Sequence, residues 1–210
     1  MHRLIEKLIK KRRQPLTITS RVSSVTNVFV QAIIPSVKPT EDEVLEALTI
    51  LGASPDHPEC VYCGAPATDW DHLRPFVKGR RPTGYIDEIR NLVPSCSTCN
   101  NSKGGQDWET WMQGSAAQSP AKRGVKGIPQ RIARLHAFEA WGNVQPIDLA
   151  ALVGEDVWNA HWNRRDEIEK LMFSAQAEAK KLRSTIRAAM GKTRPGSART
   201  RKGPGGPLTP

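Results

Sequence analysis

Apolar residues recur at helical spacing in the N-terminal part of the chain. A stripe of four of them among basic residues predicts a short helix over residues 1–14. Residues 20–34 fit either a helix or a strand, because their apolar positions have helical spacing but several are β-branched. Thr40 and Glu43 form a capping box, and the apolar residues that follow predict a helix that ends at Gly52. The N-terminal stripe consists of Leu4, Ile5, Leu8 and Ile9.

Helical periodicity returns in the C-terminal half. Residues 129–141 predict a helix, and a longer helix is predicted to follow Gly154. Within this longer helix apolar residues are spaced alternately by four and three positions, which is the spacing of a heptad seam. Because the seam contains three alanines, it fits docking on the chain's own body as well as a homodimer. The seam consists of Ile168, Met172, Ala175, Ala179, Leu182, Ile186 and Ala189.

The stretch between these helices has a different pattern. Residues 67–103 predict a strand, a Gly/Pro-rich loop, a second strand and a short helix that begins at Pro94 with Ser95 as its N-cap. Small, polar and Gly/Pro residues over 114–127 predict a linker. We therefore expect four parts: an N-terminal helical and basic segment over 1–54, a central module over 55–113, a C-terminal helical region over 128–190 and a disordered basic tail over 191–210.

Charge is distributed unevenly along the 210 residues, whose formal net charge is +10. Residues 1–40 hold eight basic residues and one acidic residue, whereas residues 55–115 hold six basic and eight acidic ones. Basic flanks favour a polyanionic partner, and among these nucleic acid, while the spared centre suits metal-binding carboxylates. No apolar run reaches the ~20 residues of a membrane span, and no export signal is evident. We expect a cytoplasmic protein without membrane contact.

All four cysteines lie in two Cys-x-x-Cys pairs, Cys60/Cys63 and Cys96/Cys99. A chain of this length does not need a disulfide scaffold, and four thiolates match a tetrahedral structural zinc site. A redox role for either pair is the alternative, but neither pair lies in a βαβ pattern. In the predicted helix Asn100 shares a face with the second pair, so it can point toward the strand with Asp71 and His72.

The central module resembles the HNH nucleases, whose signature is Cys-x-x-Cys, Asp-His-x-x-Pro, Asn-Leu and Cys-x-x-Cys-Asn-x-x-Lys. Each element is present in this order, in Cys60–Cys63, Asp71–Pro75, Asn91–Leu92 and Cys96–Lys103. The resemblance implies an α+β fold: a ββα-metal finger with structural zinc, flanked here by helical segments. The sequence around residues 21–27 also looks like that of a bacterial group of small HNH endonucleases.

The resemblance also implies roles for individual residues. His72 matches the general base that deprotonates the attacking water, and Asp71 and Asn100 match the ligands of a catalytic divalent ion. Asn91 matches the residue whose side chain fixes the loop and orients the histidine. Since Asp and Asn offer hard oxygen ligands, Mg²⁺ or Mn²⁺ suits the site. Lys103 matches a position that contacts phosphate, and Arg80 and Arg81 in the hairpin loop are further candidates for contact with DNA.

These residues suit hydrolysis of a phosphodiester bond. A divalent ion stabilises charge on the phosphate and the leaving oxygen, and a neutral imidazole accepts a proton at physiological pH. The imidazole needs a hydrogen bond at its other nitrogen, for which we expect a backbone carbonyl of the loop that Asn91 fixes. The sequence predicts a restriction or defence endonuclease acting on double-stranded DNA. The alternatives are a phage or homing-type nicking nuclease and a non-catalytic zinc module that binds nucleic acid.

Overall fold

The computed structural model describes residues 16–193, and these divide into two units. One unit comprises residues 22–166, and the other comprises the described residues 16–21 and 167–193. The helix predicted over 1–14 lies outside the described residues, as do residues 194–210 of the tail predicted over 191–210. The first three residues of that predicted tail, 191–193, are instead the last residues of a helix.

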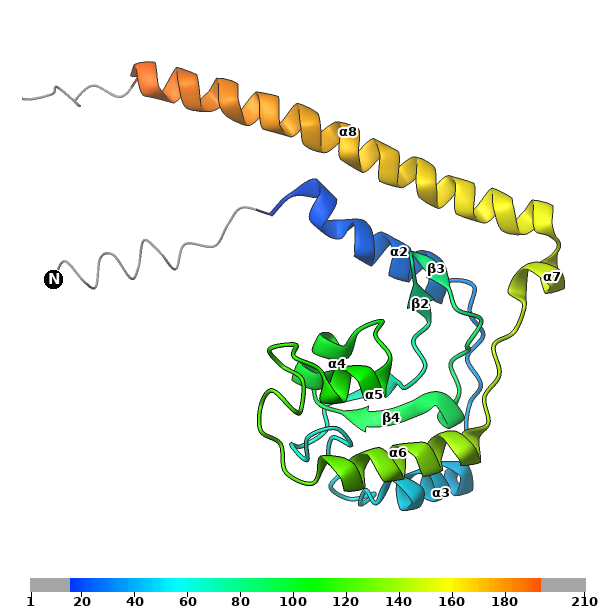
Figure 1. Cartoon of the computed structure of the whole chain (residues 1–210). Coiled ribbons are helices and arrows are strands. Elements are labelled where there is room, and N and C mark those ends of the chain that lie inside the picture. Colours follow the sequence, from blue (N-terminus) through cyan, green and yellow to red (C-terminus); the bar gives the residue numbers. More distant parts are fainter. Residues whose placement is uncertain (1–15, 194–210) are drawn as a thin grey trace, which may run out of the picture. The chain divides into compact units, whose positions relative to one another are not determined.

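Helices α2 (Val22–Gln31) and α3 (Glu41–Leu51) precede the central module (Figure 1). The segment that fitted helix or strand is therefore helical, and Val22, Thr26 and Val30 bury one side of α2 at a spacing of four residues. The predicted capping box at α3 is confirmed, since the Thr40 side chain accepts from the Glu43 N–H and Glu43 accepts in return. Gly52 ends α3 in the left-handed conformation, with φ 64°.

The centre of the larger unit contains two short antiparallel sheets. Strand β1 (Asp69–His72) pairs with β4 (Leu92–Ser95), so that Asp71 lies opposite Val93. Between them the chain forms a hairpin of β2 (Val77–Lys78) and β3 (Arg81–Pro82) and the 3-10 turn η2 (Ile89–Asn91). Helix α4 (Ser97–Lys103) follows β4 directly. The predicted α+β class and the strand–strand–helix order are confirmed.

The start of α4 corrects one prediction. Pro94 and Ser95 are the last residues of β4, and Cys96 is the N-cap of the helix. Both carbonyls are already used across the sheet and the cysteine loop, because Pro94 accepts from Val61 N–H at 3.0 Å and Ser95 accepts from Thr68 N–H at 2.9 Å. These bonds hold the two residues in an extended conformation, so the helix begins after them.

Helices α3, α5 (Trp108–Gln113) and α6 (Ile128–Gly142) build the hydrophobic core around this module, and α3 and α6 lie side by side (Figure 1). Residues 114–127, predicted as a linker, are tied to α5: Ser119 Oγ donates to the Gly114 carbonyl and Ala121 N–H donates to the Met112 carbonyl. The largest buried core side chains are Trp108, Trp111, Tyr62, Phe138, Leu73, Met112 and Leu135.

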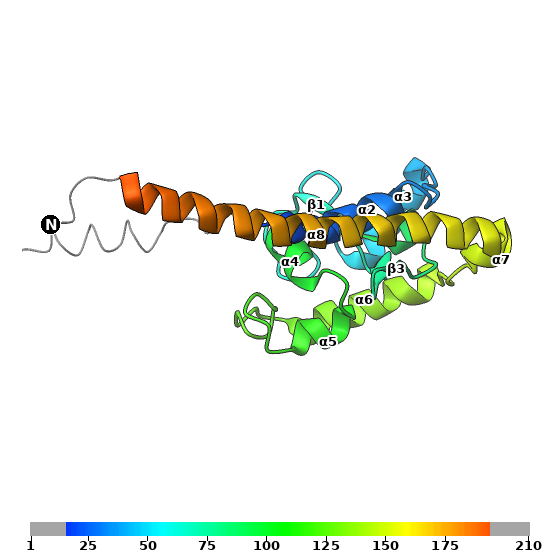
Figure 2. The ribbon, with the colours of Figure 1, turned by 90° about the horizontal axis from the view of Figure 1, so that it is seen from above.

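Helices α7 (Leu149–Val153) and α8 (Glu155–Thr193) complete the described chain, and α8 is one unbroken helix (Figure 2). Within the larger unit its first turns are fixed to α2, because buried Arg165 donates to Thr26 Oγ1 at 2.7 Å. Within the smaller unit the Gln176 amide oxygen accepts from Ile18 N–H at 2.7 Å. None of the described helices is long and apolar enough to cross a membrane.

Candidate metal centre and active site

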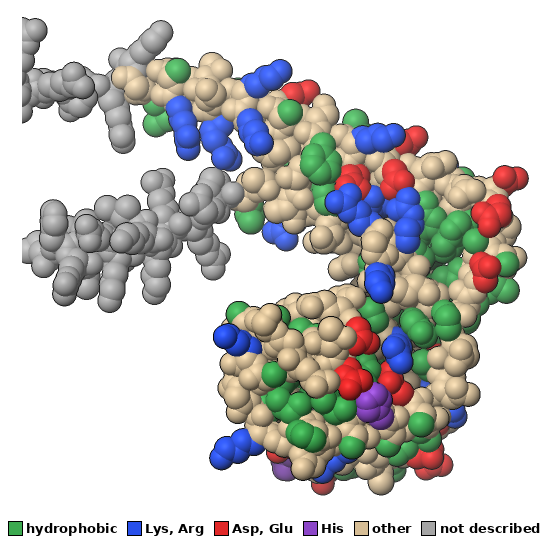
Figure 3. Space-filling model, viewed as in Figure 1, with side chains coloured by type: hydrophobic (Ala, Val, Ile, Leu, Met, Phe, Trp, Pro, Cys, Tyr) green, Lys and Arg blue, Asp and Glu red, His purple; other side chains and the backbone are tan. Residues whose placement is uncertain are grey.

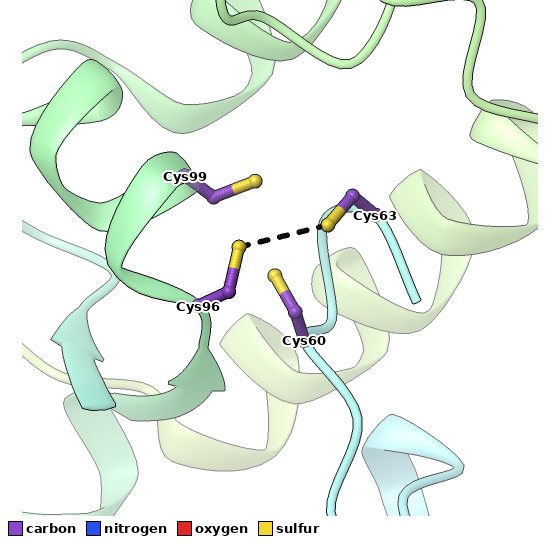
Figure 4. Close-up of side chains that lie close together, drawn as sticks. All are labelled: Cys60, Cys63, Cys96 and Cys99. Atoms are coloured by element: carbon purple, nitrogen blue, oxygen red, sulfur yellow. Dashed lines mark hydrogen bonds between the residues drawn. The ribbon is translucent and has the colours of Figure 1, made fainter. Parts of the chain in front are cut away.

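The four cysteines converge on one point (Figure 4). Cys60 and Cys63 lie in the loop before β1, Cys96 and Cys99 lie at the start of α4, and their four Sγ atoms are within 4.8 Å of one another. The Cys63 and Cys96 sulfurs are 3.7 Å apart, and all four cysteines are free of disulfides. Zinc–sulfur bonds of about 2.3 Å give sulfur separations of about 3.8 Å in a tetrahedron. The cysteines therefore fit a structural zinc ion.

Charged and polar groups near the sulfurs suit such an ion. The Arg123 guanidinium donates to Cys99 Sγ at 3.3 Å, which helps to balance the negative charge that four thiolates carry around Zn²⁺. A hydrogen bond between Cys60 and Cys99 lowers the pKa of the Cys60 thiol and raises the pKa of the Cys99 thiol, so the two thiols share a proton when no ion is bound. No other group of three or more His, Cys, Asp or Glu side chains within residues 16–193 is arranged to hold a metal ion.

The Asp71 carboxylate is buried in the middle of β1, with 5% of the residue exposed. Its Oδ2 accepts from the Tyr62 hydroxyl at 2.6 Å and lies 3.0 Å from Lys103 Nζ. Lys103 Nζ also donates to Asp71 Oδ1 at 3.3 Å and to the His72 carbonyl at 2.8 Å. These donors stabilise a carboxylate that would be costly to bury alone.

Lys103 lies in a different environment from the one expected of a phosphate contact. Its side chain is fully buried on α4, and its ammonium is used by Asp71 and the His72 carbonyl. Burial lowers the pKa of Lys103, and the negative charge of Asp71 opposes that effect. In this structure Lys103 therefore stabilises the buried Asp71 carboxylate and is not exposed at the surface.

The His72 side chain is held by a carboxylate, and this corrects the expectation of a backbone carbonyl. His72 Nε2 lies 3.1 Å from Asp87 Oδ1, and Ser36 Oγ donates to Asp87 Oδ2 at 2.6 Å. The ring also packs on Phe76, with ring centroids 3.6 Å apart. Burial lowers the pKa of His72 although Asp87 opposes the shift, so the imidazole is neutral near pH 7.

Asn91 joins the two ends of the loop that follows His72. Its Oδ1 accepts from the Arg74 N–H at 2.8 Å, and its Nδ2 donates to the Arg74 carbonyl at 3.0 Å. The Arg74 guanidinium binds Glu139 of α6 at 2.6 Å, so this loop is fixed to the helical core as well. Asn91 itself is buried and lies away from solvent.

Asp71, His72 and Asn100 line one cavity of about 280 Å³. Asn100 comes from α4, while Asn27 and Gln31 of α2 contribute to the same cavity. Asp71 and Asn100, the expected ligands of the catalytic ion, thus line the same cavity as His72, the candidate base. The carboxylate and amide oxygens of Asp71 and Asn100 are donors that suit Mg²⁺ or Mn²⁺.

The two hairpin arginines differ in their surroundings. Arg80 lies at the exposed tip of the β2–β3 hairpin with φ 65°, a conformation that costs a non-glycine residue about 1 kcal/mol or more. Arg81 donates to Asp166 at 2.7 Å, and its guanidinium carbon lies 5.0 Å from the Trp162 ring centroid. Arg81 therefore fixes the hairpin to the start of α8.

Two antiparallel strands, a following helix and a cysteine cluster at its base define a ββα-metal finger. Residues 60–106 match the model of the family described as HNH endonuclease, and they span all the motifs quoted above. This segment of the chain is similar to the HNH endonuclease family. Neither a curated protein nor a solved structure was found to match the chain.

Three residues around the site were not predicted from the sequence: Tyr62 and Asp87, which contact candidate site residues, and Ser36, which contacts Asp87. Tyr62 was visible as the residue between the first two cysteines, but nothing in the motif indicated that its hydroxyl reaches Asp71. Asp87 lies 15 positions after His72 and Ser36 lies 36 positions before it, so no local spacing indicated their contacts. Only the folded chain brings these residues together.

Removal of zinc should unfold the finger. Binding of structural zinc contributes on the order of 10 kcal/mol or more to folding of small modules. Here an ion held by the four cysteines would join the loop before β1 to the start of α4. We expect one zinc ion per chain by elemental analysis, and loss of chemical-shift dispersion from residues 58–106 after treatment with a chelator. Addition of Zn²⁺ should restore the spectrum. An unchanged spectrum of the zinc-free protein would contradict a structural role.

Proposed function

We propose that the chain is a metal-dependent DNA endonuclease that hydrolyses phosphodiester bonds with His72 as general base. The observation that carries this proposal is the shared cavity, which brings the His72 imidazole together with the side-chain oxygens of Asp71 and Asn100. A nucleic-acid-binding zinc module needs its cysteines, but it has no use for an oriented imidazole beside two hard oxygen ligands. The match of residues 60–106 to the HNH endonuclease family supports the same reaction class.

Asp71 and Asn100 would hold the catalytic Mg²⁺ or Mn²⁺. The ion, when bound, supplies positive charge to the phosphate and the leaving oxygen as negative charge develops there. Among residues 16–193, the second carboxylate oxygen of Asp71, Oδ1, accepts only from Lys103, at 3.3 Å, so it is the oxygen best able to serve as a ligand. Tyr62 and Lys103 hold Oδ2 on the other side of the carboxylate.

His72 would take the proton of the attacking water at Nδ1. Its Nε2 is directed at Asp87, which selects the tautomer with the proton on Nε2 and leaves the Nδ1 lone pair available. When His72 becomes protonated, the Asp87 carboxylate stabilises the imidazolium. Burial opposes ionisation of Asp87, but the hydrogen bonds from Ser36 and His72 outweigh it and lower the pKa of that carboxyl. Asp87 is therefore charged under physiological conditions.

Double-stranded DNA is the proposed substrate because basic side chains surround the finger in sequence and the net charge is +10. Arg80 is exposed at the hairpin tip and is the first candidate for a phosphate contact. Figure 3 shows Lys and Arg side chains along α8, and Lys180, Lys181, Arg183 and Arg187 are exposed there.

The biological role we propose is restriction or defence in the cytoplasm of a bacterium. A phage or homing-type nicking nuclease is the second candidate. Leu182 and Ile186 of the predicted heptad seam are exposed in this structure, and a homodimer through that seam stays a prediction.

Replacement of His72 by alanine should abolish cleavage while DNA binding persists. A general base contributes about 10²- to 10⁴-fold to rate, and the substitution leaves the cysteines and Asp71 in place. The measurement is digestion of supercoiled plasmid and unmethylated phage DNA with Mg²⁺ or Mn²⁺ and with EDTA, alongside a gel-shift assay. The control is His57→Ala, because His57 is exposed and outside the cavity.

The products of this digestion separate the candidate functions. Discrete bands that require metal and disappear in His72→Ala support a site-specific endonuclease, and nicked circles alone favour the nicking alternative. Retarded DNA without cleavage under any metal, from protein that contains zinc, would overturn the catalytic proposal and favour a binding module.

Asp87→Ala should lower kcat without weakening DNA binding. Loss of a hydrogen bond to a group that becomes charged costs about 1.5–3 kcal/mol, which corresponds to a decrease of about 10- to 100-fold. The control is Glu88→Ala, since Glu88 is the neighbouring carboxylate and its side chain caps no backbone group of η2. Single-turnover cleavage rates and DNA dissociation constants for the two variants make the comparison. Equal rates for both would show that His72 does not need Asp87.

Arg80→Asn should weaken DNA binding without destabilising the fold. Asparagine tolerates the left-handed conformation at this position, so the substitution removes the charge and keeps the turn. If Arg80 contacts one phosphate, the slope of log K against log salt concentration decreases by about 1. Arg134→Asn on α6 is the control, and its slope should equal that of the wild type. The idea fails if the two variants bind DNA alike across the salt series.

A further inference from the structure

We propose that Tyr62 is a positioning residue that joins the zinc-held loop to the candidate ligand Asp71. The loop Cys60–Cys63 then controls binding of the divalent ion as well as folding of the finger. This inference rests on the function proposed above, because it assumes that Asp71 is a ligand of the catalytic ion. It goes further by assigning a role in that site to a residue of the cysteine loop.

The Tyr62 side chain is held in place by the core and by Asp71. The residue is fully buried, and its ring meets the edge of Trp111 with centroids 5.2 Å apart and planes at 86°. Cys60 and Cys63 flank it, so a zinc ion on their sulfurs would fix the backbone on both sides of the ring. From this position the hydroxyl reaches across to Asp71 Oδ2 at 2.6 Å.

The loop is also fixed to the sheet through its backbone. Val61 N–H donates to the Pro94 carbonyl of β4, and Gly64 N–H donates to the Cys60 carbonyl at 2.8 Å. Arg131 of α6 donates to the carbonyls of Cys60 and Val61 at 3.4 and 3.2 Å. The backbone of the cysteine loop is therefore fixed at several points, and the Tyr62 side chain extends from it to the Asp71 carboxylate.

The hydroxyl determines which oxygen of Asp71 remains available. In the described part of the chain, Oδ2 has two donors, Tyr62 at 2.6 Å and Lys103 at 3.0 Å, while Oδ1 has one, Lys103 at 3.3 Å. Without the tyrosine hydroxyl, Lys103 would be the one side-chain donor among the described residues that still orients the carboxylate. Outer hydrogen bonds to a metal ligand typically change metal affinity by about 10- to 100-fold.

The test is Tyr62→Phe in the full chain, which removes the hydroxyl and keeps the ring on Trp111. We expect one zinc ion per chain, as in the wild type, and a dissociation constant for Mn²⁺ about tenfold higher or more, measured by electron paramagnetic resonance. The matched control is Tyr85→Phe, the same change at the second of the chain's two tyrosines, which should leave both values unchanged. Asp71→Ala identifies the Mn²⁺ site.

The outcomes separate this inference from the proposed function. Equal Mn²⁺ affinity of Tyr62→Phe and wild type, with zinc retained, overturns the role of Tyr62 and leaves the nuclease proposal standing. Failure of the wild type to bind Mn²⁺, or an Asp71→Ala variant that binds it normally, overturns both.

A second measurement does not depend on the stability of Tyr62→Phe. Wild-type protein labelled with ¹³Cζ-tyrosine gives two tyrosine signals, and the Tyr85→Phe variant assigns them. Titration with Mg²⁺ should shift the Tyr62 signal, because the ion and the hydroxyl share the Asp71 carboxylate. A Tyr62 signal that does not move while Mg²⁺ binds overturns the inference.

Discussion

The Asp71 carboxylate is a negative charge inside the protein, and its burial determines much of what surrounds it. A buried carboxylate without hydrogen-bond donors is costly, because burial removes the water that would solvate its charge. Lys103 and Tyr62 compensate for this cost by donating to Oδ2 from two different elements, α4 and the cysteine loop. Tyr62 reaches Asp71 only when the loop before β1 is folded, and Lys103 reaches it only when α4 follows β4 as it does here. Burial of the carboxylate therefore depends on both elements.

The zinc site and the hydrophobic core support the same elements from opposite sides. The four cysteines join the loop to α4, and Trp111 of α5 packs on the Tyr62 ring. Helix α6 adds two hydrogen bonds from Arg131 to the loop carbonyls and an ion pair from Glu139 to Arg74. The helices that follow the finger in sequence are therefore part of its folding unit, which fits a compact unit over residues 22–166.

The sequence was informative where chemistry requires fixed local spacing. The cysteine pairs and the capping box at Thr40 were visible because their partners lie three residues apart, and the family match confirms the finger. The start of α4 was predicted too early, because local capping preference cannot account for carbonyls used by Val61 and Thr68. Long-range partners such as Asp87 for His72 were not predictable, since hydrogen bonds between distant segments leave no period in the sequence. The buried position of Lys103 was missed for the same reason.

Long-range contacts also show why the finger alone is an incomplete description of the site. Asp87 faces His72 because its backbone pairs with the segment before α3: Val37 N–H donates to the Asp87 carbonyl at 2.7 Å, and Asp87 N–H donates to the Pro35 carbonyl at 3.1 Å. Ser36 then fixes the second carboxylate oxygen. The family match begins at residue 60, yet these contacts come from residues 35–37. The orientation of the imidazole is therefore a property of the larger unit, built by a segment outside the motif that identifies the family.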